Sequence, residues 1–271
     1  MLRIITHPDT GMRVHVGGCL RPPGGHPEAM FARFLTPAFP PIPDIYDLTA
    51  AAKDPLAQLW GNDVDGDCVP VMIFRNSAVK LCNAGDYAPP YQTSDVLGFY
   101  SRNTGFVQGD PATDQGSDPV SALQMAQKDG LLPNGSHKID GFFTINGKNP
   151  HEVRQAIWLF EGVMATASLP DAFVNPPPSA SGFVLDVCGP SNPENGHGFF
   201  FPPKYKPGAV DMSTWGMQGD MTDAAVAEYC DGNSGAVYVG ITQDMIDKAK
   251  GKAPNGLDWV AVENYFQAMR A

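Results

Sequence analysis

The alternation of apolar and polar positions divides the chain into an irregular start, a helical stretch and a stretch of short strands. Residues 56–165 are expected to be mostly helical, because apolar residues recur there at helical spacing. The clearest helix is predicted over residues 68–84, with one face formed by Val71, Phe74, Ala78 and Leu81. Pro70 falls in its first turn, where proline is tolerated because that N–H has no helical partner.

Capping residues mark further helices. One is expected to begin after Thr93 or Ser94, and another with Ser117 as N-cap and Pro119 in the first turn. A fourth is expected to begin at Asn149 and Pro150. Near the end of the chain, helices are predicted over residues 222–229, 243–250 and 257–269.

From about residue 162 the pattern changes to strands. Short apolar segments are separated by glycine, proline and asparagine, which is typical of strands joined by turns. The predicted strands cover residues 163–167, 183–187, 199–201, 210–213 and 236–239. The sequence therefore predicts an α+β fold with a helical lobe over 56–161 and a mainly sheet lobe over 162–271, which also carries the C-terminal helices.

Residues 1–55 have the composition of an arm rather than of a domain. Proline-rich segments at residues 22–25 and 37–43 cannot sustain a helix or a central strand. One edge strand is possible over residues 12–16, where polar and apolar positions alternate. We expect the arm to lie on the surface of its own domain or of a partner subunit.

Composition and charge exclude several classes of protein. The net charge of −11 argues against a nucleic-acid-binding surface. No apolar run is long enough to span a membrane, and the first residues lack the apolar core of a signal peptide, so a cytoplasmic location is expected. Five widely spaced cysteines suggest reduced thiols rather than a disulfide framework or a zinc site, and no cofactor or metal is expected.

Cys68 is the first candidate for chemistry. A glycine-rich, acidic turn over residues 61–67 precedes it, and the predicted helix begins with it. A thiol at a helix N-terminus lies beside unpaired N–H groups, which lower its pKa and favour the nucleophilic thiolate. The neighbouring Asp63, Asp65 and Asp67 oppose this effect, unless Asp67 is occupied as the helix N-cap. Taken alone, such a cysteine is more often a buried packing residue.

Three other residues form a pattern with Cys68. His197, within Gly196-His197-Gly198, could act as a base, and the Asn62 amide could donate to an oxyanion beside the Cys68 N–H. Trp215 could cover the imidazole and keep water from its polar partner. Each residue alone is more often structural, and only their joint order favours catalysis.

These segments resemble the papain-like cysteine peptidases, and more narrowly a set of bacterial and phage-encoded papain-like proteins. The resemblance is carried by Gly61-Asn62-Asp63 with Gly66-Asp67-Cys68, by Gly196-His197 and by Thr214-Trp215-Gly216. It covers most of residues 34–240, and the histidine follows the cysteine by about 130 residues, near the spacing of papain-type enzymes. The resemblance implies a two-lobe papain-like fold over residues 56–271, with a cleft in which a distant cysteine and histidine meet.

The resemblance also implies a role for each residue. Cys68 is the expected nucleophile, His197 the base, Asn62 the oxyanion donor and Trp215 the shield. Relatives usually carry an asparagine two residues before the tryptophan, bonded to the histidine, whereas this chain has Ser213. Asp211, two residues earlier on the same strand face, could replace it.

A calcium loop is a rival interpretation of residues 63–67. In an EF-hand that begins at Asp63, Cys68 would occupy the glycine position and Phe74 the position of the bidentate glutamate. The EF-hand form therefore fails, and an aspartate site of another type stays an open alternative.

Three functions fit the sequence. The first is a cysteine hydrolase that cleaves peptide or amide bonds. The second is a catalytically impaired structural or interaction protein, such as a component of a phage particle, that assembles with a protein partner or with copies of itself through residues 1–55. The third is a zymogen in which this arm blocks the cleft and is removed by cleavage before Trp60.

Overall fold

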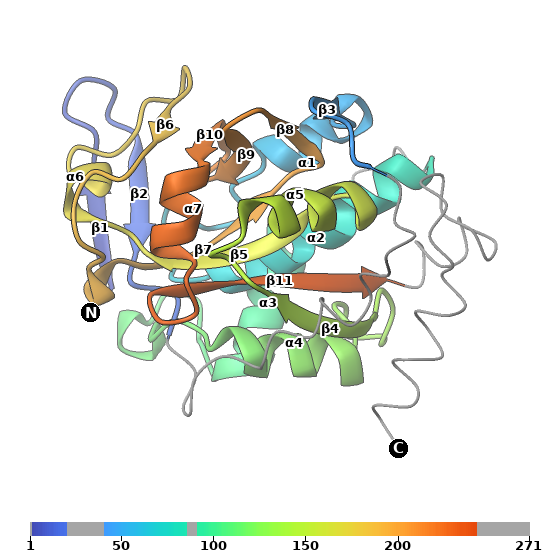
Figure 1. The fold of residues 1–271 in the computed structure, drawn as a ribbon. Helices are drawn as coiled ribbons and strands as arrows, with labels where there is room; N and C mark the ends of the chain where they lie inside the picture. The colour runs from blue at the N-terminus through green and yellow to red at the C-terminus, as the bar shows by residue number, and fades with distance from the viewer. Residues whose placement is uncertain (1, 21–40, 86–90, 243–271) are drawn as a thin grey trace.

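The computed structural model describes residues 2–20, 41–85 and 91–242. The expected helices over 243–250 and 257–269 lie outside these residues. Within them the chain forms a nine-stranded sheet whose main path runs β3-β8-β9-β7-β5-β11-β4, with helices on both faces (Figure 1). None of the described helices is long and apolar enough to cross a bilayer.

The helical elements largely follow the sequence pattern. They are η2 (Ala50–Ala52), α1 (Lys53–Ala57), α2 (Cys68–Ala84), α3 (Thr93–Thr104), η3 (Pro111–Thr113), α4 (Pro119–Lys128), α5 (Pro150–Leu159), α6 (Asp171–Val174), η4 (Pro193–Asn195) and α7 (Asp223–Tyr229). Helix α2 begins at Cys68, as predicted. The N-cap of α4 is Asp118 rather than Ser117, because the Asp118 carboxylate accepts the backbone N–H of Ser121.

The strands that follow residue 162 are β5 (Val163–Ser168), β6 (Val184–Leu185), β7 (Gly196–Phe201), β8 (Lys204–Lys206), β9 (Ala209–Thr214), β10 (Met217–Thr222) and β11 (Gly235–Thr242). Each of the five strands expected after residue 162 overlaps a strand of the structure, and β8 and β10 were not predicted. Strand β4 (Ile139–Ile145) was not predicted either. It lies in the stretch expected to be helical, but it pairs with β11 at one end of the main strand path.

Residues 1–55 are more structured than an extended arm. Strands β1 (Arg3–Thr6) and β2 (Arg13–Val16) form a hairpin, which confirms the strand expected over residues 12–16. Strand β3 (Tyr46–Asp47) pairs with β8, and α1 already begins at Lys53. Of the two proline-rich segments, residues 22–25 and 37–40 lie outside the described residues.

Apolar cores lie on the two sides of the sheet, and strand β7 contributes to both. Phe199 and Phe201 join the core that α5 and α7 cover, whereas Phe200 joins the core around α2, α3 and α4. This alternation follows from the two-residue period of a strand. Almost every residue of α2 is buried, so this helix is the centre of the second core.

Candidate functional site

Cys68 is the first residue of α2 and is almost completely buried, with 1% of its surface exposed. Burial raises the pKa of its thiol to about 12. The backbone N–H groups of Gly198, Val69 and Cys68 itself have the opposite effect and lower this pKa, but by less. The effect of the helix N-terminus therefore has the expected sign, but loss of water outweighs it. The sequence-based expectation of a lowered pKa is therefore wrong for this buried thiol.

This burial leads to a prediction about labelling. In the native chain at neutral pH, iodoacetamide should modify Cys68 much more slowly than the exposed Cys188, because the Cys68 thiol is both covered and protonated. Peptide mass spectrometry of the two sites over time measures this ratio directly. Faster labelling of Cys68 than of Cys188 at neutral pH would contradict the burial described here.

His197 lies on β7 with its imidazole fully buried. Its Nε2 shares a hydrogen bond of 2.6 Å with Thr214 Oγ1, and the Trp215 ring stacks on the imidazole with centroids 4.3 Å apart. Its Nδ1 has no hydrogen-bond partner within the part of the chain that the structure describes. Burial, then the charges of His15 and Arg75, lower the pKa of His197 to about 3, so the ring is neutral.

The tight turn after β9 sets the position of Trp215. Thr214 and Met217 pair across the turn, and the central residues Trp215 and Gly216 have positive φ angles of 47° and 70°. Such a pair of positive φ angles is typical of a two-residue type I′ hairpin turn. The Trp215 indole N–H donates to the carbonyl of His15 at 3.2 Å, which ties the turn to the N-terminal hairpin.

The partner of His197 is a residue that the sequence analysis missed. Ser213, expected in the place of the orienting asparagine, donates to the Leu56 carbonyl at 3.1 Å. Asp211, its expected substitute, forms an ion pair with Lys204 at 3.2 Å. Thr214 bonds the imidazole instead. The two-residue period of a strand could have revealed this partner, because Thr214 lies on the same core-facing side of β9 as Val210 and Met212.

Asn62 is buried in the turn before α2, with 2% of its surface exposed. Its Nδ2 has no partner of good hydrogen-bond geometry among the described residues. Asp67 occupies the N-cap position, but its carboxyl makes no capping bond, contrary to expectation. Burial, then the charge of Asp65, raises the pKa of Asp67 well above its usual range, whereas the nearby Asn62 amide lowers it.

The structure brings the strand of His197 against the helix of Cys68. Gly198 is the contact residue: its N–H acts on the Cys68 thiol, and a Cβ built on it would lie 3.1 Å from the Cys68 carbonyl oxygen. The imidazole of the preceding residue lies on the Trp215 side of the strand. Among the described residues, no hydrogen bond joins Cys68 to His197.

A backbone segment of the N-terminus crosses this region. We call residues Gly17–Leu20 the strap. On one side, the N–H groups of Gly17 and Cys19 donate to the Gly196 carbonyl at 3.0 and 3.2 Å, directly before His197. On the other side, Leu20 donates to the Ser117 carbonyl at 2.9 Å, and Ser117 donates to the Gly18 carbonyl at 2.8 Å.

The strap also passes close to the turn before Cys68. A Cβ built on Gly18 would lie 2.6 Å from the Gly66 carbonyl oxygen, so a side chain at this position requires the backbone to shift. The strap thus contacts the turn before Cys68, the residue before His197 and the segment before α4. We call this arrangement, with the strap in place, the closed state.

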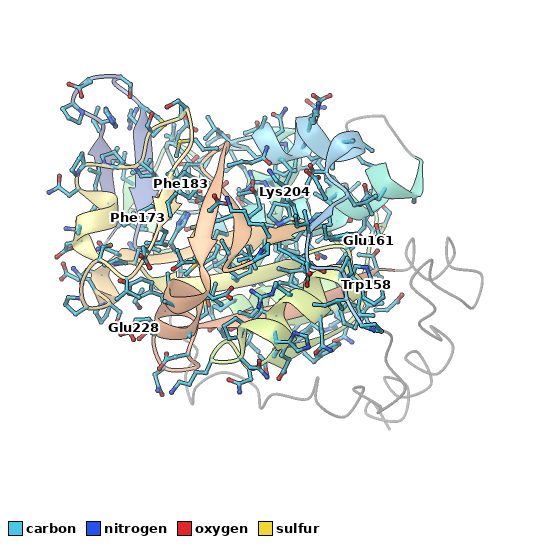
Figure 2. All side chains as sticks on the ribbon, turned by 45° about the horizontal axis from the view of Figure 1, so that its top comes forward. Trp158, Glu161, Phe173, Phe183, Lys204 and Glu228 are labelled. Atoms are coloured by element: carbon cyan, nitrogen blue, oxygen red, sulfur yellow. The ribbon has the colours of Figure 1, made fainter. Side chains whose placement is uncertain are left out.

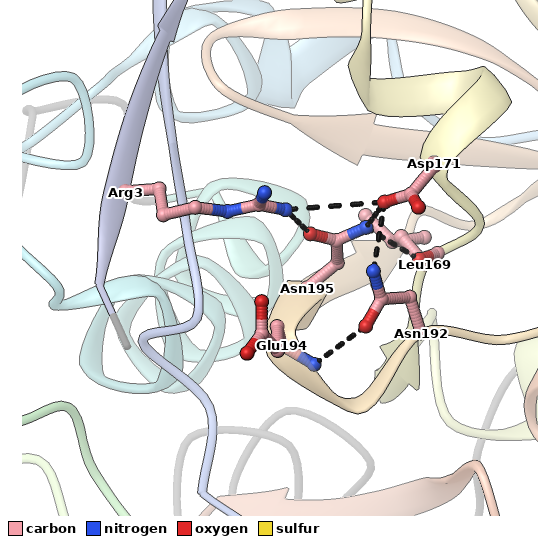
Figure 3. Close-up of polar contacts among 6 residues, drawn as sticks. All are labelled: Arg3, Leu169, Asp171, Asn192, Glu194 and Asn195. Carbon is pink, nitrogen blue, oxygen red and sulfur yellow. Dashed lines mark hydrogen bonds and ion pairs between the residues drawn. The ribbon is translucent and has the colours of Figure 1, made fainter.

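A polar network anchors the hairpin that leads into the strap (Figure 3). The Arg3 guanidinium donates to Asn195 Oδ1, and Asn195 Nδ2 donates to Asp171 Oδ1 and to the Leu169 carbonyl, both at 2.9 Å. Asn192 adds a bond of 2.8 Å to the same Asp171 oxygen. The loop immediately before His197 is therefore held to β1, far away in the sequence.

The described residues contain no group of three or more histidine, cysteine, aspartate or glutamate side chains arranged to hold a metal ion. Of the aspartates considered for a calcium loop, Asp67 is fully buried, whereas Asp63 and Asp65 are partly exposed.

Comparison with solved structures gives a fold neighbour. The chain is similar to the crystal structure of xylellain, a cysteine protease from Xylella fastidiosa, with a TM-score of 0.53 and 12% sequence identity. The match covers 84% of this chain and 96% of xylellain. No protein-family model and no curated protein sequence matches the chain. The likeness shows that the chain shares the fold of xylellain.

Proposed function

We propose that this chain is a cysteine hydrolase that cleaves peptide or amide bonds, with Cys68 as nucleophile and His197 as base. One observation carries the proposal. The His197 ring is held at Nε2 by Thr214 and covered by Trp215, while its Nδ1 lacks a partner and the next residue contacts Cys68. With the ring proton on Nε2, the Nδ1 lone pair is free to accept a proton.

In the structure the imidazole lies on the Trp215 side of β7 and Gly198 faces Cys68, so the proposed reaction first needs the two side chains to come together. The Cys68 thiol transfers its proton to His197 Nδ1, and the thiolate attacks the carbonyl carbon of the substrate. The Cys68 N–H and Asn62 Nδ2, which makes no hydrogen bond of good geometry within the described residues, donate to the oxyanion. The imidazolium then protonates the leaving amine, and water hydrolyses the thioester to free the acid and the thiol.

In the closed state this proton transfer is unfavourable. The thiol holds its proton with a pKa of about 12, whereas the imidazole, with a pKa of about 3, is a weak base. Burial is the largest cause of both shifts, so readmitting water moves the two pKa values toward each other. We therefore expect catalysis only after the strap leaves the site.

The test uses full-length chains and a library of fluorogenic peptides. The variant Gly18→Val, which has no room for its side chain in the closed strap, should hydrolyse peptides, whereas the native chain should not. Adding Cys68→Ala or His197→Ala to it should abolish hydrolysis. If iodoacetamide reaches Cys68 in Gly18→Val and no peptide or amide is cleaved, the proposal fails.

A structural role is the second candidate, and the closed, neutral site favours it. In that case residues 1–55 would dock the domain on a protein partner or on another copy of the chain. A chain lacking only residues 21–40, which keeps the N-terminal hairpin that packs in the core, should then lose its assembly in sedimentation experiments, whereas unchanged assembly would count against this role. A place in a phage particle stays a prediction from the sequence resemblance.

A further inference from the structure

A concave site lies on the sheet and involves none of the residues Cys68, His197 or Asn62. It is a groove of about 400 Å³ over strands β3, β8, β9 and β10. Lys204 and Phe183, both labelled in Figure 2, line it. The other residues that matter here are Tyr46, Lys206, Asp211 and Asp220.

Asp211 is the unusual group in this groove. Its side chain is only 5% exposed, and one carboxylate oxygen lies 3.2 Å from Lys204 Nζ. The other oxygen, Oδ2, has no hydrogen-bond partner among the described residues. A buried carboxylate oxygen without a donor is costly and rare in folded proteins, which points to a donor that binds from outside the chain.

The strand geometry separates this carboxylate from the cysteine site. Asp211 lies opposite Asp220 in the antiparallel pair of β9 and β10, so the two carboxylates share one face. Thr214, which bonds His197, belongs to the other face of β9. Asp211 is therefore not needed to orient the imidazole.

The charged side chains that line the groove have a net charge of −1, which one bound cation would neutralise. Lys204 pairs with Asp211, and Lys206 pairs with Asp220 at 2.6 Å, while Asp47 adds a third carboxylate. Three carboxylates and two ammonium groups give one excess negative charge. The Lys204 side chain is 41% exposed on a flexible stem, so it can move aside from Asp211.

The walls of the groove suit an alkyl or planar group. Tyr46 and Tyr205 form an aromatic pair with centroids 5.6 Å apart, and Phe183 is a third aromatic residue in the lining. Aromatic faces attract organic cations as well as their apolar stems. Together these features describe a site for a charged donor with a short carbon chain.

We propose that this groove binds a small organic cation, an alkyl guanidinium or ammonium group. An N–H group of the cation donates a hydrogen bond to Asp211 Oδ2, the oxygen without a partner among the described residues. The cation is either a free small molecule or the basic side chain of a peptide. Binding depends on the ionised carboxylate of Asp211 and is independent of Cys68.

The titration of Asp211 gives the pH dependence. Burial raises its pKa to about 6, Lys204 on β8 lowers it, and Asp220 on β10 and Asp47 on β3 raise it. The carboxylate is thus mostly ionised at pH 7.5 and protonated below about pH 6. Cation binding should weaken as the pH falls through this range, and the bound cation should lower the pKa.

Calorimetric titration at pH 7.5 and low salt tests the proposal, with n-butylguanidinium as the probe. The variant Asp211→Asn should weaken binding by about tenfold or more, since it removes a charge-assisted hydrogen bond. Asp231→Asn is the matched control: it removes the same charge from an aspartate–lysine pair outside the groove, so it should change binding little. A blocked Ala-Arg-Ala peptide that binds more tightly than the probe identifies a peptide side chain as the source, whereas equal or weaker binding identifies a free cation.

Three results would overturn the proposal. They are equal binding of uncharged n-butylurea, binding of inorganic phosphate in place of the cation, and unchanged affinity in Asp211→Asn. If that variant does not fold, carboxyl NMR of the native chain decides. The titration midpoint of Asp211 should fall when n-butylguanidinium is added, and an unchanged midpoint would refute the site.

Discussion

Replacing Gly18 by valine should raise the rate at which iodoacetamide labels Cys68 at neutral pH by about three orders of magnitude. Four backbone hydrogen bonds hold the strap, and each contributes about 1 kcal/mol. Since about 1.4 kcal/mol corresponds to a factor of ten, losing all four bonds should raise the fraction of molecules with an open site by about three orders of magnitude. The valine cannot fit in the closed strap, because even a Cβ would lie 2.6 Å from the Gly66 carbonyl oxygen.

The labelling experiment has an internal reference site and a control variant. Labelling of the exposed Cys188 measures the intrinsic rate in the same sample. Gly98→Val adds the same atoms to a glycine of α3 whose Cβ position has nothing closer than Arg102 Nη1 at 4.0 Å, so Cys68 should stay protected. If Gly18→Val leaves the ratio of Cys68 to Cys188 labelling unchanged while the protein stays folded, the strap does not close the site.

Replacing Trp215 by alanine should lower the free energy of unfolding by about 3–5 kcal/mol. The indole is 3% exposed, stacks on His197 and lies 6.4 Å from the Phe173 ring, so its removal leaves a large cavity. Trp215→Phe keeps an aromatic ring on His197 and loses mainly the N–H bond to His15, which should cost about 1–2 kcal/mol.

Urea unfolding followed by far-ultraviolet circular dichroism measures both variants without relying on tryptophan fluorescence. The difference between them isolates the packing on His197 from the bond to the N-terminal hairpin. Equal losses in the two variants would mean that the hydrogen bond, rather than the stacked ring, makes the main contribution of Trp215.

The start of α2 and the strands around His197 could be predicted because local signals set them. The glycine-rich turn stops any regular element before Cys68, and the apolar run after it has a helical period. Strand β4 escaped prediction because Asp140 and Gly141 interrupt its apolar pattern. Its pairing with β11, more than ninety residues later, stabilises it instead.

The chemistry of the site was harder to predict than its residues. The sign of the Cys68 pKa shift depends on burial, which tertiary packing determines. Thr214 rather than Ser213 bonds His197, because Thr214 lies on the face of β9 that meets the imidazole. Counting residues back from Trp215 does not reveal this, because Trp215 already belongs to the turn and not to the strand. The position of the strap could not be predicted from the sequence, because backbone groups rather than side chains make its hydrogen bonds.

The anchoring of the N-terminal hairpin affects how the chain folds during synthesis. The bond from Trp215 to His15 spans 200 residues, and the bond from Arg3 to Asn195 spans 192. Contacts of such long range form slowly, because most of the chain must be ordered first. A ribosome therefore makes the hairpin and the cysteine helix long before it makes the residues that close the site. The nascent thiol stays open to water, oxidants and chaperones until β7 and β9 emerge.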